Sequence, residues 1–387
     1  MDYFYELYAA YILKRAIELG EDDVLSINTE ERYVPFARLL AEKAKEITGN
    51  GSYLVIIENK RAKEAVEIFS DYLIEKNPTV FIYLQGREEE PEFENNRIYS
   101  AREAQLFNHL SSPTILPEAE VSFLTIPMPN ELWAEKIGED RLEKNAALLI
   151  SDFLSLSSEK NMPTLKEAVE IDNYDKMNLN SHKGLKAKLY SDDGMVDLSF
   201  SFVDESIFKS LVFETKNKRK FLPHLFPSSY FRAIDKKSAE GHVYTNMPFL
   251  LFGKIIGSAG FEFENGKVVS FSSSEEDAER LNTYLMQDED ASALAEISIT
   301  ETFSELEEIP LFNYTEWDKL RGIVLSLGAP RSEAVPFESE EEAALKGIAS
   351  SLFTLSIPLG TGLTLSVENE DGEEEIVYSD GFIEDNQ

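Results

Sequence analysis

The residues of this chain that could do chemistry are carboxylates and a few imidazoles, and the best placed of them lie in its C-terminal half. Glu296 is the one carboxylate in the short apolar run of residues 294–299, whose composition predicts a β-strand. Carboxylates and imidazoles bind divalent metal ions, and two such ions about 3.5–4 Å apart can polarise a water and a carbonyl oxygen together. The other candidate ligands for such a site are His224, Glu301, Glu316 and Asp318.

Each of these candidates also has a purely structural explanation. Glu296 could be a buried carboxylate paired with a nearby base, and His224 could be a surface or capping histidine. Glu301, Glu316 and Asp318 could be solvated or hydrogen-bonded within the fold. The residue types alone therefore leave both interpretations open, and no catalytic residue can be named from them.

Several other chemistries are excluded by the residues that the chain lacks. There are no cysteines, so disulfides, thiolate metal sites and cysteine nucleophiles are absent. The sequence has no H-E-x-x-H motif, no G-x-S-x-G elbow and no glycine-rich phosphate loop. A serine nucleophile stays open, because its partners are set by the fold and not by spacing.

The charge balance limits the partners of the protein. Asp and Glu number 72 against 37 Lys and Arg, which gives a formal net charge of −35. Such a field repels nucleic acid and anionic lipid, so we expect neither as a partner. The acidic residues are explained either by a solvated surface or by a lumen that attracts cationic peptide N-termini. No signal peptide and no apolar run of about 18 residues is present, so a cytoplasmic protein is expected.

The pattern of apolar residues predicts an α/β protein with two domains. Helical and strand-like segments alternate in the first half, which implies βαβ units and a parallel sheet. Beyond residues 182–184 the period changes to two, which is typical of antiparallel strands. We therefore predict an N-terminal doubly wound α/β domain over residues 1–182 and a C-terminal strand-rich α+β domain over residues 183–387.

The clearest local signals lie between Gly260 and Gly328. Two alternating strands flank Asn265 and Gly266, and this dipeptide is a strong predictor of a β-hairpin with positive φ at both turn residues. Ser274 then caps a predicted helix whose first turn is acidic. The Glu296 strand follows.

This order of elements resembles the core of the aminopeptidase T and aminopeptidase S family of dinuclear-metal aminopeptidases, also called thermophilic metalloproteases. The family hairpin reads roughly F-K-D-G-K-V, and a helix, L-G-E-V-A-L and L-F-x-N-T-L-F-D-E-N-x-x-x-H-I-A-x-G follow it. Upstream, Pro129, Trp133 and Ala134 resemble the P-x-x-x-W-A part of the family motif Y-P-x-x-x-W-A. The resemblance implies the aminopeptidase T-like fold for the C-terminal domain and a homodimer around an internal cavity.

The resemblance also implies six metal ligands, of which this chain keeps one. Glu296 matches the Glu of L-G-E-V-A-L. The other Glu falls at Ser229 or Tyr230, the first His at Val324, and the Tyr at Arg331. The last His and Asp fall at Leu355 and Ile357. One carboxylate cannot hold a pair of dications against water, so no cofactor is expected.

The matched positions lead to two hypotheses for function. In the first, the chain is a degenerate family member, a pseudoenzyme that acts as a peptide-binding or scaffold protein. In the second, it is an active metal-dependent aminopeptidase with a rearranged site around Glu296, which would hold two zinc, cobalt or manganese ions. A metal-free hydrolase that uses the same cavity is a third, weaker hypothesis.

Overall fold

The computed structural model describes most of the chain, with internal gaps. The described residues are 1–56, 78–86, 121–138, 140, 142–157, 163–225, 229–251, 254–301, 312, 315–318, 320–331, 333–335, 339–369 and 371–385. They form two compact units. The first comprises Met1–Ile171 and Leu211–Phe226, and the second comprises Asp172–Ser210 and Pro227–Gln387. The domain boundary predicted at residues 182 and 183 stays a prediction.

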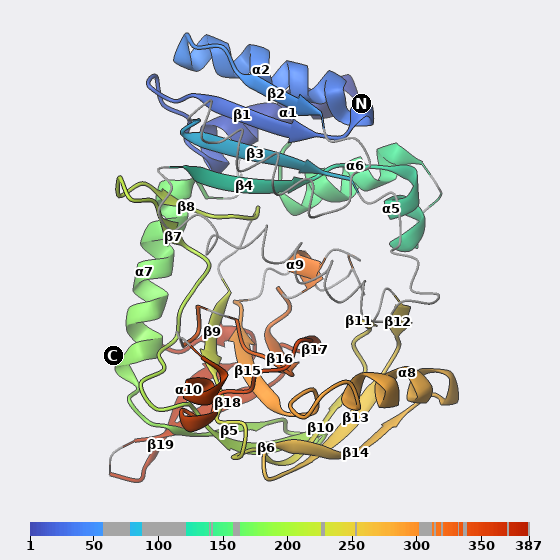
Figure 1. The fold of residues 1–387 in the computed structure, drawn as a ribbon, viewed down its shortest axis with the longest axis vertical. Helices are drawn as coiled ribbons and strands as arrows, with labels where there is room; N and C mark the ends of the chain where they lie inside the picture. The colour runs from blue at the N-terminus through green and yellow to red at the C-terminus, as the bar shows by residue number, and fades with distance from the viewer. Residues whose placement is uncertain are drawn as a thin grey trace. The chain divides into compact units, whose positions relative to one another are not determined.

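The first unit is built on a parallel sheet of four strands (Figure 1). Its strands are β1 (Leu25–Thr29), β2 (Tyr53–Ile56), β3 (Val80–Gln85) and β4 (Ser122–Pro127), in the order β2-β1-β3-β4. The order reverses between β1 and β3, as in a doubly wound sheet. All residues of β1 and β4 are buried, as expected for strands covered on both faces.

Helices accompany this sheet in the α/β alternation that the sequence predicts. Helix α2 (Val34–Thr48) contacts β1 and β2, and it ends at Gly49, whose φ is 71°. The other helical segments of this unit are α1 (Asp2–Tyr11), η1 (Ile12–Ala16), η2 (Glu31–Tyr33), α5 (Glu131–Lys136) and α6 (Glu143–Phe153). The predicted helices at residues 61–75 and 101–110 lie outside the described residues.

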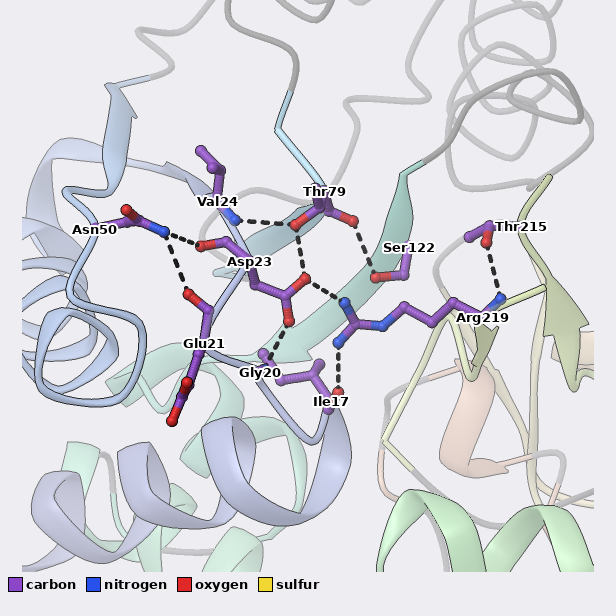
Figure 2. Close-up of polar contacts among 10 residues, drawn as sticks. All are labelled: Ile17, Gly20, Glu21, Asp23, Val24, Asn50, Thr79, Ser122, Thr215 and Arg219. Carbon is purple, nitrogen blue, oxygen red and sulfur yellow. Dashed lines mark hydrogen bonds and ion pairs between the residues drawn. The ribbon is translucent and has the colours of Figure 1, made fainter. Parts of the chain in front are cut away.

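A polar cluster connects a distant segment of the chain to this sheet (Figure 2). The carboxylate of Asp23, just before β1, accepts hydrogen bonds from the Gly20 N–H at 2.7 Å and from the Thr79 hydroxyl at 2.7 Å. The Arg219 guanidinium donates to Asp23 at 2.5 Å and to the Ile17 carbonyl at 2.8 Å. Arg219 lies between β7 (Phe213–Glu214) and β8 (Lys220–Phe221), so the ion pair fixes this small hairpin within the first unit.

The second unit consists mainly of two antiparallel sheets that share one core (Figure 1). The larger sheet has the order β14-β13-β10-β6-β5-β18-β19-β20 and the smaller one the order β17-β16-β15-β9. The larger sheet comprises β5 (Lys186–Tyr190), β6 (Val196–Ser201), β10 (Glu240–Thr245), β13 (Ala259–Glu264), β14 (Lys267–Ser273), β18 (Thr364–Glu368), β19 (Glu374–Ser379) and β20 (Phe382–Ile383). The smaller comprises β9 (Tyr230–Ala233), β15 (Leu294–Ile299), β16 (Ile323–Leu327) and β17 (Leu355–Gly360).

The remaining described elements are short, apart from two helices. Helix α7 (Leu165–Ser181) contains the point at which the chain passes from the first unit to the second. The others are α8 (Glu275–Leu285), α9 (Thr315–Asp318), α10 (Glu340–Leu345) and the pair β11 (Phe249–Leu251) and β12 (Lys254–Ile256). No helix among the described residues is long and apolar enough to cross a bilayer.

The hairpin and the capped helix form as the sequence predicts. β13 and β14 pair in antiparallel fashion around Asn265 and Gly266, whose φ values are 51° and 81°. The Ser274 side chain accepts a hydrogen bond from the Asp277 N–H at 3.2 Å and so caps α8. The fold class predicted from the sequence, α/β with a strand-rich second half, is confirmed.

Candidate site around Glu296

Glu296 is buried in β15 with both carboxylate oxygens occupied. Its side chain is 2% exposed. Oε2 accepts the backbone N–H of Arg331 at 2.7 Å, and Oε1 accepts the hydroxyl of Ser298 at 3.2 Å. The Arg331 Nε lies 3.6 Å from Oε1. The guanidinium of Arg331 thus compensates the buried negative charge of Glu296, so the cation beside this carboxylate comes from the protein itself.

Arg331 reaches Glu296 from the segment that follows β16. Its guanidinium carbon lies 4.4 Å from the centroid of the Phe231 ring on β9, which is a cation–π distance. The Arg331 side chain is 16% exposed, and its buried Nη1 atom has no hydrogen-bond partner in the described part of the chain. Arginine is suited to this place, because it stays charged and can stack on a ring while it binds a carboxylate.

The strand register shows which residues share the sheet face with Glu296. Directly paired residues of neighbouring strands point to the same face. Glu296 pairs with Ala233 on one side and Ser326 on the other, and Ser298 pairs with Phe231 and Val324. In β17, Ser356 lies opposite Ser326, and Pro358 lies opposite Val324. This face is therefore lined by serine, one glutamate and apolar groups.

The opposite face of the smaller sheet belongs to the hydrophobic core. Ile297, Leu325, Leu355 and Ile357 are among the buried residues shared with the larger sheet. The two β17 positions matched to the last His and Asp thus point away from the face that carries Glu296. Val324 lies on the Glu296 face and is 1% exposed.

Ser229 and Tyr230, the two positions matched to the missing Glu, have opposite orientations. Tyr230 belongs to the core, and its hydroxyl donates to the Asp175 carboxylate at 2.6 Å. Ser229 lies two residues before Phe231, and therefore on the Glu296 face, with 1% exposure. The alternation thus places Ser229, and not Tyr230, on the face that carries Glu296.

Three of the four other predicted helpers have different partners or belong to another part of the fold. His224 forms a bridge with Thr125 inside the first unit, whereas Glu296 belongs to the second. Asp318 accepts the Phe312 N–H at 2.6 Å. Glu301 accepts the Ile383 N–H at 3.2 Å. The fourth, Glu316, lies in α9, and its side chain is outside what the structure describes.

Glu301 lies near further acidic groups in the second unit. Burial raises its pKa above the usual range, and the nearby Asp175 and Asp385 carboxylates add to the increase. In the described part of the chain, no group of three or more His, Asp or Glu side chains is arranged to hold a metal ion.

The described residues around Glu296 do not fit a pair of divalent metal ions. The described part of its sheet face offers one carboxylate, and both oxygens of that carboxylate already accept hydrogen bonds from Ser298 and Arg331. The Arg331 guanidinium is itself a cation beside the carboxylate, and it would repel a dication at close range. We therefore derive no chemical step through a metal.

Sequence reasoning missed two contributors to this site. Ser298 lies two residues after Glu296 in the same strand, so the period of two could have placed it on the same face. The pairing of Arg331 with Glu296 had no local signal, because it depends on how the chain turns back after β16. Arg331 entered the sequence analysis only as a replacement for a tyrosine.

Comparison with known proteins identifies first the fold of the chain and then its family. Wild-type AmpT from Thermus thermophilus is similar over 98% of this chain and 98% of its own, with a TM-score of 0.77 and 18% identity. The protein thus has the fold of AmpT. A family model described as thermophilic metalloprotease (M29) matches residues 3–382. The chain belongs to the thermophilic metalloprotease (M29) family, and the resemblance seen in the sequence is confirmed. A search of curated proteins found no match.

Proposed function

We propose that this protein is a family member without a working dinuclear centre, and that it binds a peptide or amino acid instead of hydrolysing it. One observation carries the proposal: the carboxylate of Glu296 is neutralised by Arg331 of the same chain. The Val324 side chain on the same face supports it, because an apolar group supplies neither a donor nor a charge for a metal. Both observations support a site in which Glu296 is paired within the chain and is not a metal ligand.

Elemental analysis and a peptidase assay test this proposal together. The protein is purified without chelator, and zinc, cobalt and manganese are measured per chain. We expect less than about 0.1 equivalent of each, since one neutralised carboxylate is a poor ligand. Hydrolysis of leucine p-nitroanilide should stay at the buffer rate with and without each added metal.

The Glu296→Gln variant separates the proposal from the active alternative. Near-stoichiometric metal, with metal-dependent hydrolysis that Glu296→Gln abolishes, would establish a rearranged site around Glu296 and overturn the proposal. Metal-dependent hydrolysis that survives this change would place an active site elsewhere in the chain. It would also contradict the proposal that the protein binds a peptide without hydrolysing it.

The homodimer expected from the resemblance remains part of the proposal. It is supported by family membership, and the partner surface is a separate question from the Glu296 site. Mass photometry of the purified chain should give about twice the monomer mass of 43.9 kDa. A single monomer peak at micromolar concentration would remove the dimer from the proposal and leave the binding function untouched.

A further inference from the structure

Three buried polar groups beside Glu296 have no hydrogen-bond partner among the residues that the structure describes. They are the hydroxyls of Ser229 and Thr300 and the Nη1 of Arg331. Ser229 and Thr300 are each 1% exposed. An unpaired buried donor is costly, and in native proteins such a group commonly marks a bound water, ion or ligand. A group of three on one face therefore requires an explanation.

The strand register brings the two hydroxyls together. Ile299 pairs with Tyr230 at the end of the β9–β15 ladder, and Thr300 and Ser229 are the residues that follow this last pair on the two strands. On the other side of β15, the Thr300 N–H donates to the Gly322 carbonyl at 2.9 Å, so Thr300 continues the extended path of the strand. Both side chains alternate away from Tyr230 and Ile299, which belong to the core. They therefore point to the face that carries Glu296.

The Arg331 guanidinium packs on β9, next to the position two residues after Ser229. This position is Phe231, on whose ring the guanidinium stacks. Same-face positions along a strand are about 7 Å apart, so a small ligand can contact the hydroxyls and Nη1 at once. Nη1 itself is buried, but the Arg331 side chain as a whole keeps 16% exposure, so solvent reaches this side chain next to the three groups.

The chemistry of the three groups selects an anionic acceptor. Two are hydroxyls that can donate, and the third is a permanently charged N–H donor. Glu296, the carboxylate paired with Arg331, already accepts from Ser298 and Arg331. A ligand that pairs with all three groups must offer acceptor oxygens and negative charge. A carboxylate is favoured over a phosphate dianion, because Glu296 lies beside the Arg331 guanidinium and repels the higher charge more strongly.

We propose that Arg331, Ser229 and Thr300 bind the carboxylate of a short peptide or amino acid on the sheet face that carries Glu296. The inference rests on the proposed function, since it assigns the anchor for the ligand of a site that has no metal pair. In a metal site, anionic side chains bind cations from solution. Here the opposite holds, because a cationic side chain of the protein binds an anion from solution. In this arrangement Glu296 positions Arg331 and does not touch the ligand.

Calorimetric titration with matched probes tests the carboxylate requirement. The full-length protein is titrated with tri-alanine and, separately, with the same tripeptide as its C-terminal amide. We expect the carboxylate form to bind at least about tenfold more tightly, as a charge-assisted hydrogen bond to a buried donor implies. Inorganic phosphate serves as a third probe, and it should compete poorly at equal concentration.

Variants that remove a hydroxyl give a signature that a structural role would not produce. Thr300→Val and Ser229→Ala delete unpaired buried polar groups, so each should leave the melting temperature of the ligand-free protein unchanged or higher. Each should also weaken tri-alanine binding by about fivefold or more. Thr283→Val, on helix α8 where the hydroxyl bonds to the Glu279 carbonyl, is the control for the substitution itself. It should not alter binding.

The possible results decide between the ligand and simpler explanations. Equal affinity for the carboxylate and the amide would overturn the proposal, and so would preferential binding of phosphate. If Thr300→Val lowers the melting temperature and leaves binding unchanged, an ordered water fills the site and the proposal fails. Metal-dependent peptidase activity would contradict the proposed function instead, so the two failures are distinguishable.

Discussion

The Glu296–Arg331 pair is an interaction at which a single substitution should have a large effect. Arg331→Ala would leave the Glu296 carboxylate buried, with the Ser298 hydroxyl and a backbone N–H as its remaining partners among the described residues. We expect a loss of about 3 kcal/mol in the free energy of unfolding, since removing one member of a buried pair strands the other charge. Urea unfolding followed by circular dichroism measures it.

A double-mutant cycle shows whether the charge causes this loss. Glu296→Gln added to Arg331→Ala should recover a large part of the stability, because the stranded charge is removed. Arg280→Ala is the control, since Arg280 pairs within α8 with Glu276 and Asp277 and is itself 31% exposed, so its loss should cost less than about 1 kcal/mol. Equal losses for Arg331→Ala and Arg280→Ala would show that the Glu296 pair is not important for stability.

For single residues, the sequence predicted which side chains would be buried better than it predicted their partners. The apolar neighbours of Glu296 predicted a buried carboxylate, and its pairing with a base was one of the alternatives left open. The choice of Arg331 as that base could not be read from the sequence, since 34 residues of intervening chain, part of it outside any strand, bring the two together. Leu355 and Ile357 illustrate the same difficulty, because the assignment of a face depends on a register that spacing alone does not determine.

The β13–β14 hairpin contains a turn in which only glycine fits. Gly266 has φ of 81°, and a Cβ there would lie 2.0 Å from the Lys236 carbonyl oxygen. Gly266→Ala should therefore cost about 3 kcal/mol or more, from backbone strain and a forced shift of Lys236 together. Thermal unfolding of the variant measures the loss.

Gly194→Ala is a matched control for this substitution. Gly194 also has a positive φ, of 74°, but a Cβ there meets nothing within 4 Å. Only the backbone strain of about 1 kcal/mol should remain. Similar losses at the two glycines would mean that the contact with Lys236 relaxes easily.

The β7–β8 hairpin depends on an ion pair that responds to pH. Burial opposes the charge of Asp23, but hydrogen bonds from the Gly20 N–H, the Thr79 hydroxyl and Arg219 lower its pKa below the usual range. A lowered folded-state pKa stabilises the fold above the unfolded value of about 3.9, and that contribution is lost as the pH falls through the folded value. Asp23→Asn should therefore lower the unfolding free energy at pH 7 by about 2 kcal/mol.

The pH profile of this variant distinguishes charge from packing. The difference between the parent chain and Asp23→Asn should shrink as the pH falls from about 5 towards 2, because the parent carboxyl becomes protonated. Unfolding at several pH values measures it. A difference that is constant across this range would show that the charge of Asp23 contributes nothing.

Local signals predicted these elements because the physics that forms them is local. Asn265 and Gly266 supply the positive φ of a hairpin, and Ser274 supplies a helix cap, within a few residues. The β7–β8 hairpin is different. Arg219 pairs with Asp23 at a separation of 196 residues, and no periodicity in the sequence indicates this contact.

The net charge of −35 makes the whole molecule sensitive to salt. Repulsion between carboxylates opposes the compact state, and added ions screen it over a Debye length of about 10 Å at 0.1 M. Raising potassium chloride from about 0.05 M to about 0.5 M should therefore raise the melting temperature. Differential scanning calorimetry measures it, and a decrease would show that attractive ion pairs outweigh the repulsion.

The path of the chain between the two units limits how the protein can be dissected. The chain enters the second unit at Asp172 and returns to the first unit for Leu211–Phe226. Arg219 on this returning segment forms an ion pair with Asp23. A gene fragment that stops at residue 171 would omit the β7–β8 hairpin and leave the Asp23 carboxylate without its guanidinium. An independently expressed first unit would need residues 211–226 grafted on through a new linker, and a single protease cut within α7 would nick the protein without releasing either half.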